Sequence, residues 1–204
     1  KRVENDEVWT LMSEHECPGL SDVYGDEFEK LYTKYENDKK NLEKIKARDL
    51  MSKIIEAQIE TGQPYMLYKD SINNKSNQKN IGVIKSSNLC AEIVEYSDKN
   101  ETSVCNLASI ALPKFVKKTD KKIFYDYDAL YETAKLATKN LDEVIDINFY
   151  PTDKTERSNN KHRPIGLGIQ GLADVYFKLG IGYESDKAKE INKLIFETIY
   201  FGAL

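Results

Sequence analysis

The feature that most limits the possible folds is an alternation of long amphipathic helical patterns with short apolar runs. Apolar residues recur at spacings of three and four over 42–59 and 130–145; Asp126 or Asp128 can cap the second pattern, and Ser185 a third. Helices that alternate with short apolar runs indicate an α/β fold. The side chains expected on the buried faces are Leu42, Ile45, Leu50, Met51, Ile54, Ile55 and Ile59, then Leu130, Ala134, Ala137, Leu141, Val144 and Ile145, then Ile191, Leu194, Ile195 and Ile199.

The segments between these helices carry weaker patterns. Apolar residues over 28–35 fit one face of a short helix, the run over 65–68 is expected to be a buried strand, and 71–80 is expected to be a polar loop. β-branched residues over 81–96 and 102–112 flank the polar turn SDKNE, which predicts a hairpin of two extended segments.

Composition limits the class of protein. With 204 residues, 40% of them hydrophobic and 31% charged, the chain is typical of soluble globular proteins. A net charge of −4 argues against a nucleic-acid binder, and no apolar run is long enough to predict a membrane span. Three cysteines are typical of a reducing compartment, so we expect a cytoplasmic location. The chain starts without an initiator methionine, and we expect it to be an internal part of a longer protein.

The stretch SNLCAEI places Asn88, Cys90 and Glu92 two residues apart. In an extended chain such side chains point the same way, at a spacing of roughly 6.5–7 Å, so that one small ligand such as a sugar ring could touch all three. The alternative is a buried cysteine and a solvent-facing glutamate with no shared role.

Cys105 lies on the second extended run of the predicted hairpin. If the loop has an even number of residues, Cys90 and Cys105 fall on the same face, where they could form a disulfide or a cooperating pair of thiols. The alternative is that Cys105 is a small buried apolar residue.

Residues Gly166, Gly168 and Gly171 match the G-x-G-x-x-G dinucleotide pattern, and Glu184 or Asp186 lies near the expected acidic position. The polar segment TDKTERSNNKHRP precedes the pattern, whereas a dinucleotide fingerprint follows a buried strand. We therefore expect the glycines to permit close packing of a strand and a helix.

Only two histidines are present. His15 with Cys17 could suggest a metal site, and His15 with Cys90 a thiol hydrolase. Without a C-x-x-C pair we favour structural roles for these residues, and we expect no metal site.

Four longer stretches carry a family resemblance: KSNQKNIGVIKSSNLCAEIVEY, ETSVCNLASIALPKFV, HRPIGLGIQGLADVYF and NKLIFETIYFGAL. Together they resemble the large, catalytic subunit of class I ribonucleoside-diphosphate reductase of the eukaryotic type. HECPGL, YGDEFEKLY and ETGQPYMLYKDSINNKSNQ are similar to it as well. The resemblance extends over the whole chain, and its core is SNLC-x-EI followed by VCNLASIAL.

The resemblance implies a ten-stranded α/β barrel made of two five-stranded halves, with a finger loop that carries a radical cysteine into its centre. Residues 1–204 would form a single partial domain of that barrel, with the finger loop at about 86–100 and Cys90 at its tip. The N-terminal ATP-binding region, the effector loops and the C-terminal tail of the family would lie outside this chain.

The resemblance also implies roles for five residues. Cys90 would form a thiyl radical and abstract the 3′ hydrogen of the ribose, and Glu92 would act as general base on the 3′-OH. Asn88 would hydrogen-bond the ribose hydroxyls and orient that carboxylate, and Leu89 would join these three in contacting substrate. Cys105 would be one of two thiols that end as a disulfide, with its partner cysteine outside this chain.

The parent enzyme would reduce ribonucleoside diphosphates to 2′-deoxyribonucleoside diphosphates and so supply DNA precursors. Its expected partners are a small subunit with a di-iron tyrosyl radical, further large subunits in a homodimer or higher oligomer, and thioredoxin or glutaredoxin as reductant. ATP, dATP, dTTP and dGTP are the expected effectors. No cofactor, nucleic acid or membrane is expected on this chain, which we expect to be inactive alone.

Single motifs, taken without the resemblance, allow two other classes of function. The chain could be an interaction module with a structural Cys90–Cys105 disulfide. It could also be a nicotinamide oxidoreductase that uses Gly166 to Gly171. Free-thiol labelling and dinucleotide binding would separate these from a radical reductase.

Overall fold

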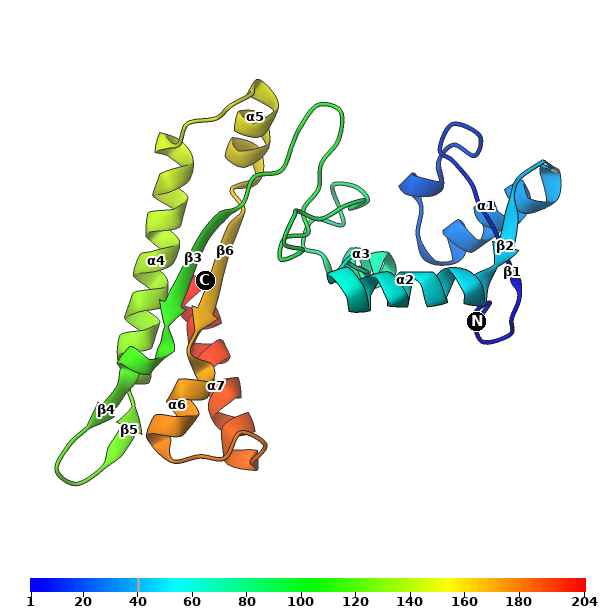
Figure 1. Ribbon diagram of the computed structural model, residues 1–204. Helices are drawn as coiled ribbons and strands as arrows, with labels where there is room; N and C mark the ends of the chain where they lie inside the picture. The colour runs from blue at the N-terminus through cyan, green and yellow to red at the C-terminus, as the bar shows by residue number, and fades with distance from the viewer. Residues whose placement is uncertain (40) are drawn as a thin grey trace. The chain divides into compact units, whose positions relative to one another are not determined.

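The computed structural model describes residues 1–39 and 41–204, which form two compact units, Lys1–Asp98 (unit 1) and Lys99–Leu204 (unit 2) (Figure 1). The assignment of residues 1–204 to one partial barrel domain stays a prediction. Among the helices of the described ranges, none combines the length and the apolar character needed to cross a membrane. Helices and short strands alternate along the chain, in agreement with the α/β fold that the sequence predicts.

In unit 1 a short antiparallel sheet is joined to a helix by one tyrosine. Strands β1 and β2 pair from Val8 opposite Lys46 to Thr10 opposite Lys44. The buried Tyr32 of helix α1 accepts a hydrogen bond from the Thr10 N–H at 2.7 Å and donates one to the Thr10 carbonyl at 2.9 Å. The elements of unit 1 are β1 (Val8–Thr10), η1 (Leu20–Asp22), α1 (Gly25–Asp38), β2 (Lys44–Lys46), α2 (Ala47–Thr61) and α3 (Lys69–Lys75).

The helix predicted to include Leu42 begins only at Ala47. Ile45 belongs to strand β2, where it pairs with Trp9, because the backbone there bonds to β1 instead of to the next helical turn. The helix ends at Thr61, and Gly62, with φ of 75°, takes the left-handed conformation that commonly ends a helix.

Three further expectations for unit 1 are wrong. Ile55 and Ile59 of α2 were expected on a buried face but are exposed. Residues 65–68 form no strand, and all four side chains are exposed, because no neighbouring strand pairs with them in the described structure. Helix α3 occupies part of the predicted polar loop over 71–80; its Asn73 is buried and bonds to the backbone of Ile84.

Unit 2 is built on a parallel pair of strands with helix α4 between them in sequence. Strands β3 and β6 pair from Asn106 opposite Ile165 to Ala111 opposite Gln170, and α4 packs on both strands and on α7 (Figure 1). The core between them is apolar. The elements are β3 (Asn106–Ala111), η2 (Leu112–Phe115), β4 (Val116–Lys118), β5 (Ile123–Tyr125), α4 (Tyr127–Ile147), α5 (Asp153–His162), β6 (Ile165–Gln170), α6 (Leu172–Leu179) and α7 (Asp186–Ala203). The buried residues of the apolar core of unit 2 are Ile110, Leu112, Phe115, Tyr125, Leu130, Ala134, Val175, Tyr176, Ala188, Ile191, Ile195 and Ile199.

The predicted helix caps of unit 2 are confirmed. The Asp126 side chain accepts a hydrogen bond from the Ala129 N–H at 3.0 Å, and the Ser185 hydroxyl accepts one from the Ala188 N–H at 3.1 Å. Val144 and Leu194 were expected to face inward but are exposed, because each lies at the edge of its helix's apolar stripe.

The predicted hairpin of 81–96 with 102–112 is wrong. Residues 81–96 contain no strand in the described structure, and β3 pairs in parallel with β6 instead. Side chains bond the backbone at several points of 81–96, which removes the need for a neighbouring strand there. The shared face proposed for Cys90 and Cys105 is lost with the hairpin.

Candidate active site

Asn88, Cys90 and Glu92 lie on a tight turn and not on an extended segment. The Ala91 N–H donates to the Asn88 carbonyl at 3.1 Å, and Ala91 has φ of 62°. A positive φ at a residue with a Cβ costs free energy and is typical of tight turns that neighbouring contacts hold in place. The predicted period-two alternation of these three residues is therefore wrong, although they remain neighbours.

The turn brings the Asn88 amide onto the Glu92 carboxylate. Asn88 Nδ2 donates to Glu92 Oε1 at 2.5 Å, while Asn88 Oδ1 accepts from the Ile93 N–H at 3.1 Å. The Ser87 hydroxyl closes the base of the turn by donating to the Ile93 carbonyl at 2.5 Å. One amide thus fixes both the backbone of the turn and the direction of a carboxylate.

Cys90 lies at the exposed end of this turn, next to Leu89, whose side chain is 85% exposed. Among the described residues Cys90 is a free thiol and forms no disulfide. A thiol, an amide and a carboxylate that face solvent within five residues can contact a small polyhydroxylated ligand together.

Side chains from outside the turn hold both of its arms. Buried Asn73 donates to the Ile84 carbonyl at 3.0 Å and accepts from the Ile84 N–H at 2.8 Å, as a neighbouring strand would. On the other arm, the Gln78 side chain accepts from the Tyr96 N–H at 2.7 Å. Gly82 leaves room for the Tyr96 ring, since a Cβ there would lie 2.2 Å from it. The two arms of the turn are therefore each anchored to another segment of unit 1.

Cys105 lies in unit 2, immediately before strand β3, and is half-buried. Its sulfur is close to β6: a Cβ added to Gly166 would lie 3.3 Å from Cys105 Sγ. The start of β3 therefore presents this thiol beside a residue that has no side chain.

A buried amide network fixes the strand that follows Cys105. Asn106 Nδ2 donates to Asn159 Oδ1 and to the Pro164 carbonyl, each at 3.1 Å. Asn159 Nδ2 donates in turn to the Tyr150 hydroxyl at 2.5 Å. The sequence gives no signal for this network, because Asn106 lies 53 residues from Asn159 and 58 residues from Pro164 along the chain.

A second buried cluster precedes Cys105. The Glu101 carboxylate lies 3.3 Å from Lys161 Nζ and 3.2 Å from His162 Nε2, and both Glu101 and His162 are almost fully buried. Burying a carboxylate is costly unless charged or hydrogen-bonding partners surround it, so this cluster ties the segment before Cys105 to the end of α5.

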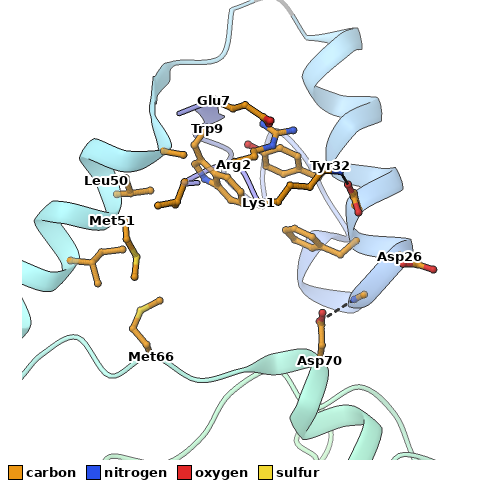
Figure 2. A pocket seen from close by; sticks show the side chains of 16 residues that line it. Lys1, Arg2, Glu7, Trp9, Asp26, Tyr32, Leu50, Met51, Met66 and Asp70 are labelled. Atoms are coloured by element: carbon orange, nitrogen blue, oxygen red, sulfur yellow. Dashed lines mark hydrogen bonds and ion pairs between the residues drawn. The ribbon is translucent and has the colours of Figure 1, made fainter. Parts of the chain in front are cut away.

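Unit 1 also contains a cavity of about 720 Å³, shown in Figure 2. Arg2 lies over Trp9 and Tyr32, with its guanidinium carbon 5.7 Å and 4.9 Å from the two ring centroids. Its hydrogen bonds to Glu36 lower the pKa of that carboxyl to about 2. The residues of the Asn88–Glu92 turn do not line this cavity.

The remaining sequence candidates do not form sites. Gly166 and Gly168 lie inside strand β6, and only Gly171, with φ of 79°, stands between the strand and helix α6. In a dinucleotide fingerprint the glycines form the turn that follows the strand. In residues 1–39 and 41–204, no three side chains of His, Cys, Asp or Glu gather as metal ligands would. Cys17 is buried in unit 1.

Comparison with known proteins gives a consistent assignment. The family model described as "Ribonucleotide reductase, barrel domain" matches residues 1–204. The chain is 56% identical to the ribonucleoside-diphosphate reductase large subunit of Plasmodium falciparum and 55% identical to large chain 2 of Saccharomyces cerevisiae. It is 54% identical to the large chain of Neurospora crassa. These alignments include the whole chain but only 25%, 24% and 22% of the three relatives.

The expected resemblance is confirmed over the full length of the sequence, and the chain spans about a quarter of the length of the relatives it matches. The mixed α/β arrangement of its elements agrees with that assignment. This chain belongs to the ribonucleotide reductase large-subunit family, within the part that forms the barrel domain.

Proposed function

We propose that this chain supplies the radical-bearing part of an active site that reduces ribonucleoside diphosphates to 2′-deoxyribonucleoside diphosphates. The observation that carries the proposal is the turn in which Asn88 donates to Glu92 at 2.5 Å beside the exposed thiol of Cys90. Membership of the large-subunit family supports it.

The reaction must replace a ribose 2′-OH by hydrogen, and hydroxide is a poor leaving group from an unactivated carbon. In our proposal the Cys90 thiyl radical takes the 3′ hydrogen atom and leaves a carbon radical at C3′. Glu92 accepts the 3′-OH proton, which assists departure of the 2′-OH as water. Asn88 holds the Glu92 carboxylate toward the ribose, and Leu89 lies against the substrate.

Two thiols supply the two electrons and two protons that the net reaction consumes. Cys105 is one of them; the other, as the family resemblance implies, is a cysteine outside this chain. Their sulfurs end as a disulfide, and Cys90 regains its thiyl radical when the 3′ hydrogen atom returns to the substrate. An external dithiol such as thioredoxin or glutaredoxin reduces the disulfide by exchange.

The same proposal assigns partners to the parent protein. A small subunit with a di-iron tyrosyl radical generates the radical that reaches Cys90. Nucleotide effectors bind to parts of the parent protein outside this chain, large subunits associate with one another, and the enzyme acts in the cytoplasm.

The test compares Cys90→Ser with Cys105→Ser in the full-length protein, with its small subunit and a dithiol. Cys90→Ser should abolish reduction and leave the substrate intact, because a serine O–H is much harder to convert to a radical. Cys105→Ser should still allow hydrogen abstraction but stall afterwards, so that base is released and the small-subunit radical decays on addition of substrate.

Turnover by Cys90→Ser, or identical behaviour of the two variants, would overturn these roles.

A further inference from the structure

Gly166 is the residue of strand β6 that lies against the Cys105 sulfur. A Cβ at this position would come within 3.3 Å of Cys105 Sγ and 2.4 Å of Leu107 Cδ2. Gly168, two residues further along the same strand, has a different environment: the nearest atom to a Cβ there is the Ala108 carbonyl oxygen at 3.7 Å, an ordinary contact distance. Of the two glycines of β6, only Gly166 therefore has neighbours that an added Cβ would displace.

The backbone of Gly166 does not itself require glycine. Its φ lies outside the left-handed region, and it pairs regularly with Leu107 in the β3–β6 ladder. Nor does it contact a dinucleotide phosphate at a helix start, because it lies near the beginning of a strand. The remaining reason for a glycine at this position is the lack of space for a side chain between the Cys105 sulfur and Leu107.

The two atoms that a Cβ at Gly166 would displace are Cys105 Sγ and Leu107 Cδ2. Displacement of the sulfur would impair function, whereas displacement of the leucine methyl would not. Leu107 is 54% exposed, and the conflicting atom is the end of a flexible side chain. Cys105 is half-buried at the start of a strand whose next residue, Asn106, is fixed by the buried amide network. A methyl group at Gly166 would therefore displace the thiol by a few tenths of an ångström while the backbone holds its place.

We propose that Gly166 is a positioning residue for Cys105, which keeps open the space in which the Cys105 sulfur turns between its thiol and disulfide states. The inference rests on the proposed function, in which Cys105 joins a second cysteine as a disulfide and an incoming thiolate later breaks that bond. Disulfide exchange depends on access to the sulfur, so a neighbouring side chain would slow both the formation and the reduction of the bond.

The test uses the full-length enzyme with its small subunit and a dithiol reductant, and compares Gly166→Ala with Gly168→Ala. Gly166→Ala should lower kcat by about tenfold with KM for the nucleotide nearly unchanged, since the reacting sulfur is misplaced but the substrate contacts are kept. The alkylation rate of Cys105 by iodoacetamide, read from its peptide by mass spectrometry, should fall as well. Gly168→Ala should match wild type in both measurements.

A double variant separates the sulfur from Leu107. Leu107→Ala removes the atom at 2.4 Å, so Gly166→Ala in that background keeps only the conflict with Cys105. The double variant should retain the defect in kcat and in alkylation, while Leu107→Ala alone should not show it. If Gly166→Ala does not fold, this double variant carries the test.

Recovery of kcat in the double variant, or equal behaviour of Gly166→Ala and Gly168→Ala, would overturn the inference. The Cys105→Ser variant distinguishes the failure of this inference from the failure of the proposed function. Full turnover by Cys105→Ser would contradict the role of Cys105 itself. If Cys105→Ser loses turnover while Gly166→Ala keeps the wild-type kcat, only the role of Gly166 is contradicted.

Discussion

At the scale of single residues, Asn88 uses both ends of its amide. The N–H₂ end donates to Glu92 and the oxygen accepts from the Ile93 N–H, so the hydrogen-bond partners leave only one orientation of the amide. The Ile93 N–H is part of the backbone of the turn. Through Asn88, the Glu92 carboxylate is therefore held in a fixed position relative to the backbone that carries Cys90. A general base contributes only when its oxygen is held within reach of the proton it removes.

Glu92→Gln in the full-length enzyme should therefore preserve the fold and lower kcat by about 10²–10⁴-fold, the typical contribution of one well-placed base. The amide keeps the shape of the side chain but cannot accept the proton. Steady-state deoxynucleotide formation measures the effect, with Asp98→Asn, an exposed acid of the same loop, as control. A rate for Glu92→Gln within threefold of wild type would contradict the assigned role.

A second prediction at this scale concerns Glu36 and pH. The hydrogen bonds from Arg2 lower the pKa of Glu36 from 4.5 to about 2, so the folded state binds this proton less readily than the unfolded chain does. The pair stabilises unit 1 above pH 4.5, by at most on the order of 3 kcal/mol, and this stabilisation is lost as the pH falls from 4.5 toward 2.

Hydrogen–deuterium exchange of β1 and α1, compared between wild type and Glu36→Gln at each pH, measures this effect. The difference in protection should be largest near pH 7 and should narrow below about pH 4.5. A difference that stays constant between pH 7 and pH 4 and below would show that the charge of Glu36 is not the cause.

At the scale of elements, helix α3 acts on the candidate site through one side chain. Asn73 is 1% exposed and makes three hydrogen bonds, one to the Lys69 carbonyl within its own helix and two to the backbone of Ile84. Ile84 begins the arm that leads to the turn with Cys90. The position of that turn therefore depends on a helix that makes no contact with substrate in our proposal.

Asn73→Ala should leave a buried N–H and a buried carbonyl of Ile84 without these partners, at a cost of about 1–3 kcal/mol each. We expect faster hydrogen exchange over 80–97 in the full-length protein and a lower kcat. Asn74→Ala is the matched control, because Asn74 is the exposed neighbour on the same helix. Equal exchange in the two variants would show that Asn73 does not anchor the arm.

The local elements show which features of the fold can be predicted from sequence. The caps at Asp126 and Ser185 were predictable, because a capping side chain and its N–H partner lie three residues apart. Strand β3 was placed in a hairpin with its sequence neighbour, whereas its partner β6 lies beyond two helices. No local pattern carries the identity of a parallel partner at such a distance.

The candidate site, like the fold, was predicted only in part. Asn88, Cys90 and Glu92 were correctly expected to be neighbours, but on an extended chain, since sequence alone did not reveal the positive φ of Ala91. The support from Asn73 could not be predicted, because its segment was expected to be a loop.

At the scale of the whole molecule, each of the three sheets in the described residues has two strands. A two-stranded sheet leaves backbone groups unpaired along both outer edges, and isolated pairs of strands are at best marginally stable. Two-stranded sheets in a chain that spans a quarter of its relatives are consistent with strands that pair further in a larger barrel.

The 204-residue chain by itself should therefore form no deoxynucleotide, even with small subunit and dithiol added. The proposed mechanism needs a second reductant thiol besides Cys105, and the family resemblance implies that this cysteine lies outside the 204 residues. Product formation is measured by chromatography of labelled nucleotide, with the full-length protein as positive control. Catalytic amounts of product from the chain alone would contradict this prediction.

The parallel pairing of β3 with β6 also sets an order of events during translation. Asn106 pairs with Ile165, so about 60 residues must be synthesised after β3 before its partner exists. At 5–20 residues per second this takes about 3–12 s. Cysteine labelling of ribosome-bound chains, stalled before and after β6 has left the ribosome, should find Cys105 more reactive in the shorter chain. During those seconds the nascent chain displays an unpaired strand edge and an uncovered thiol, so the interval before β6 emerges is when this part of the protein is most open to aggregation and oxidation.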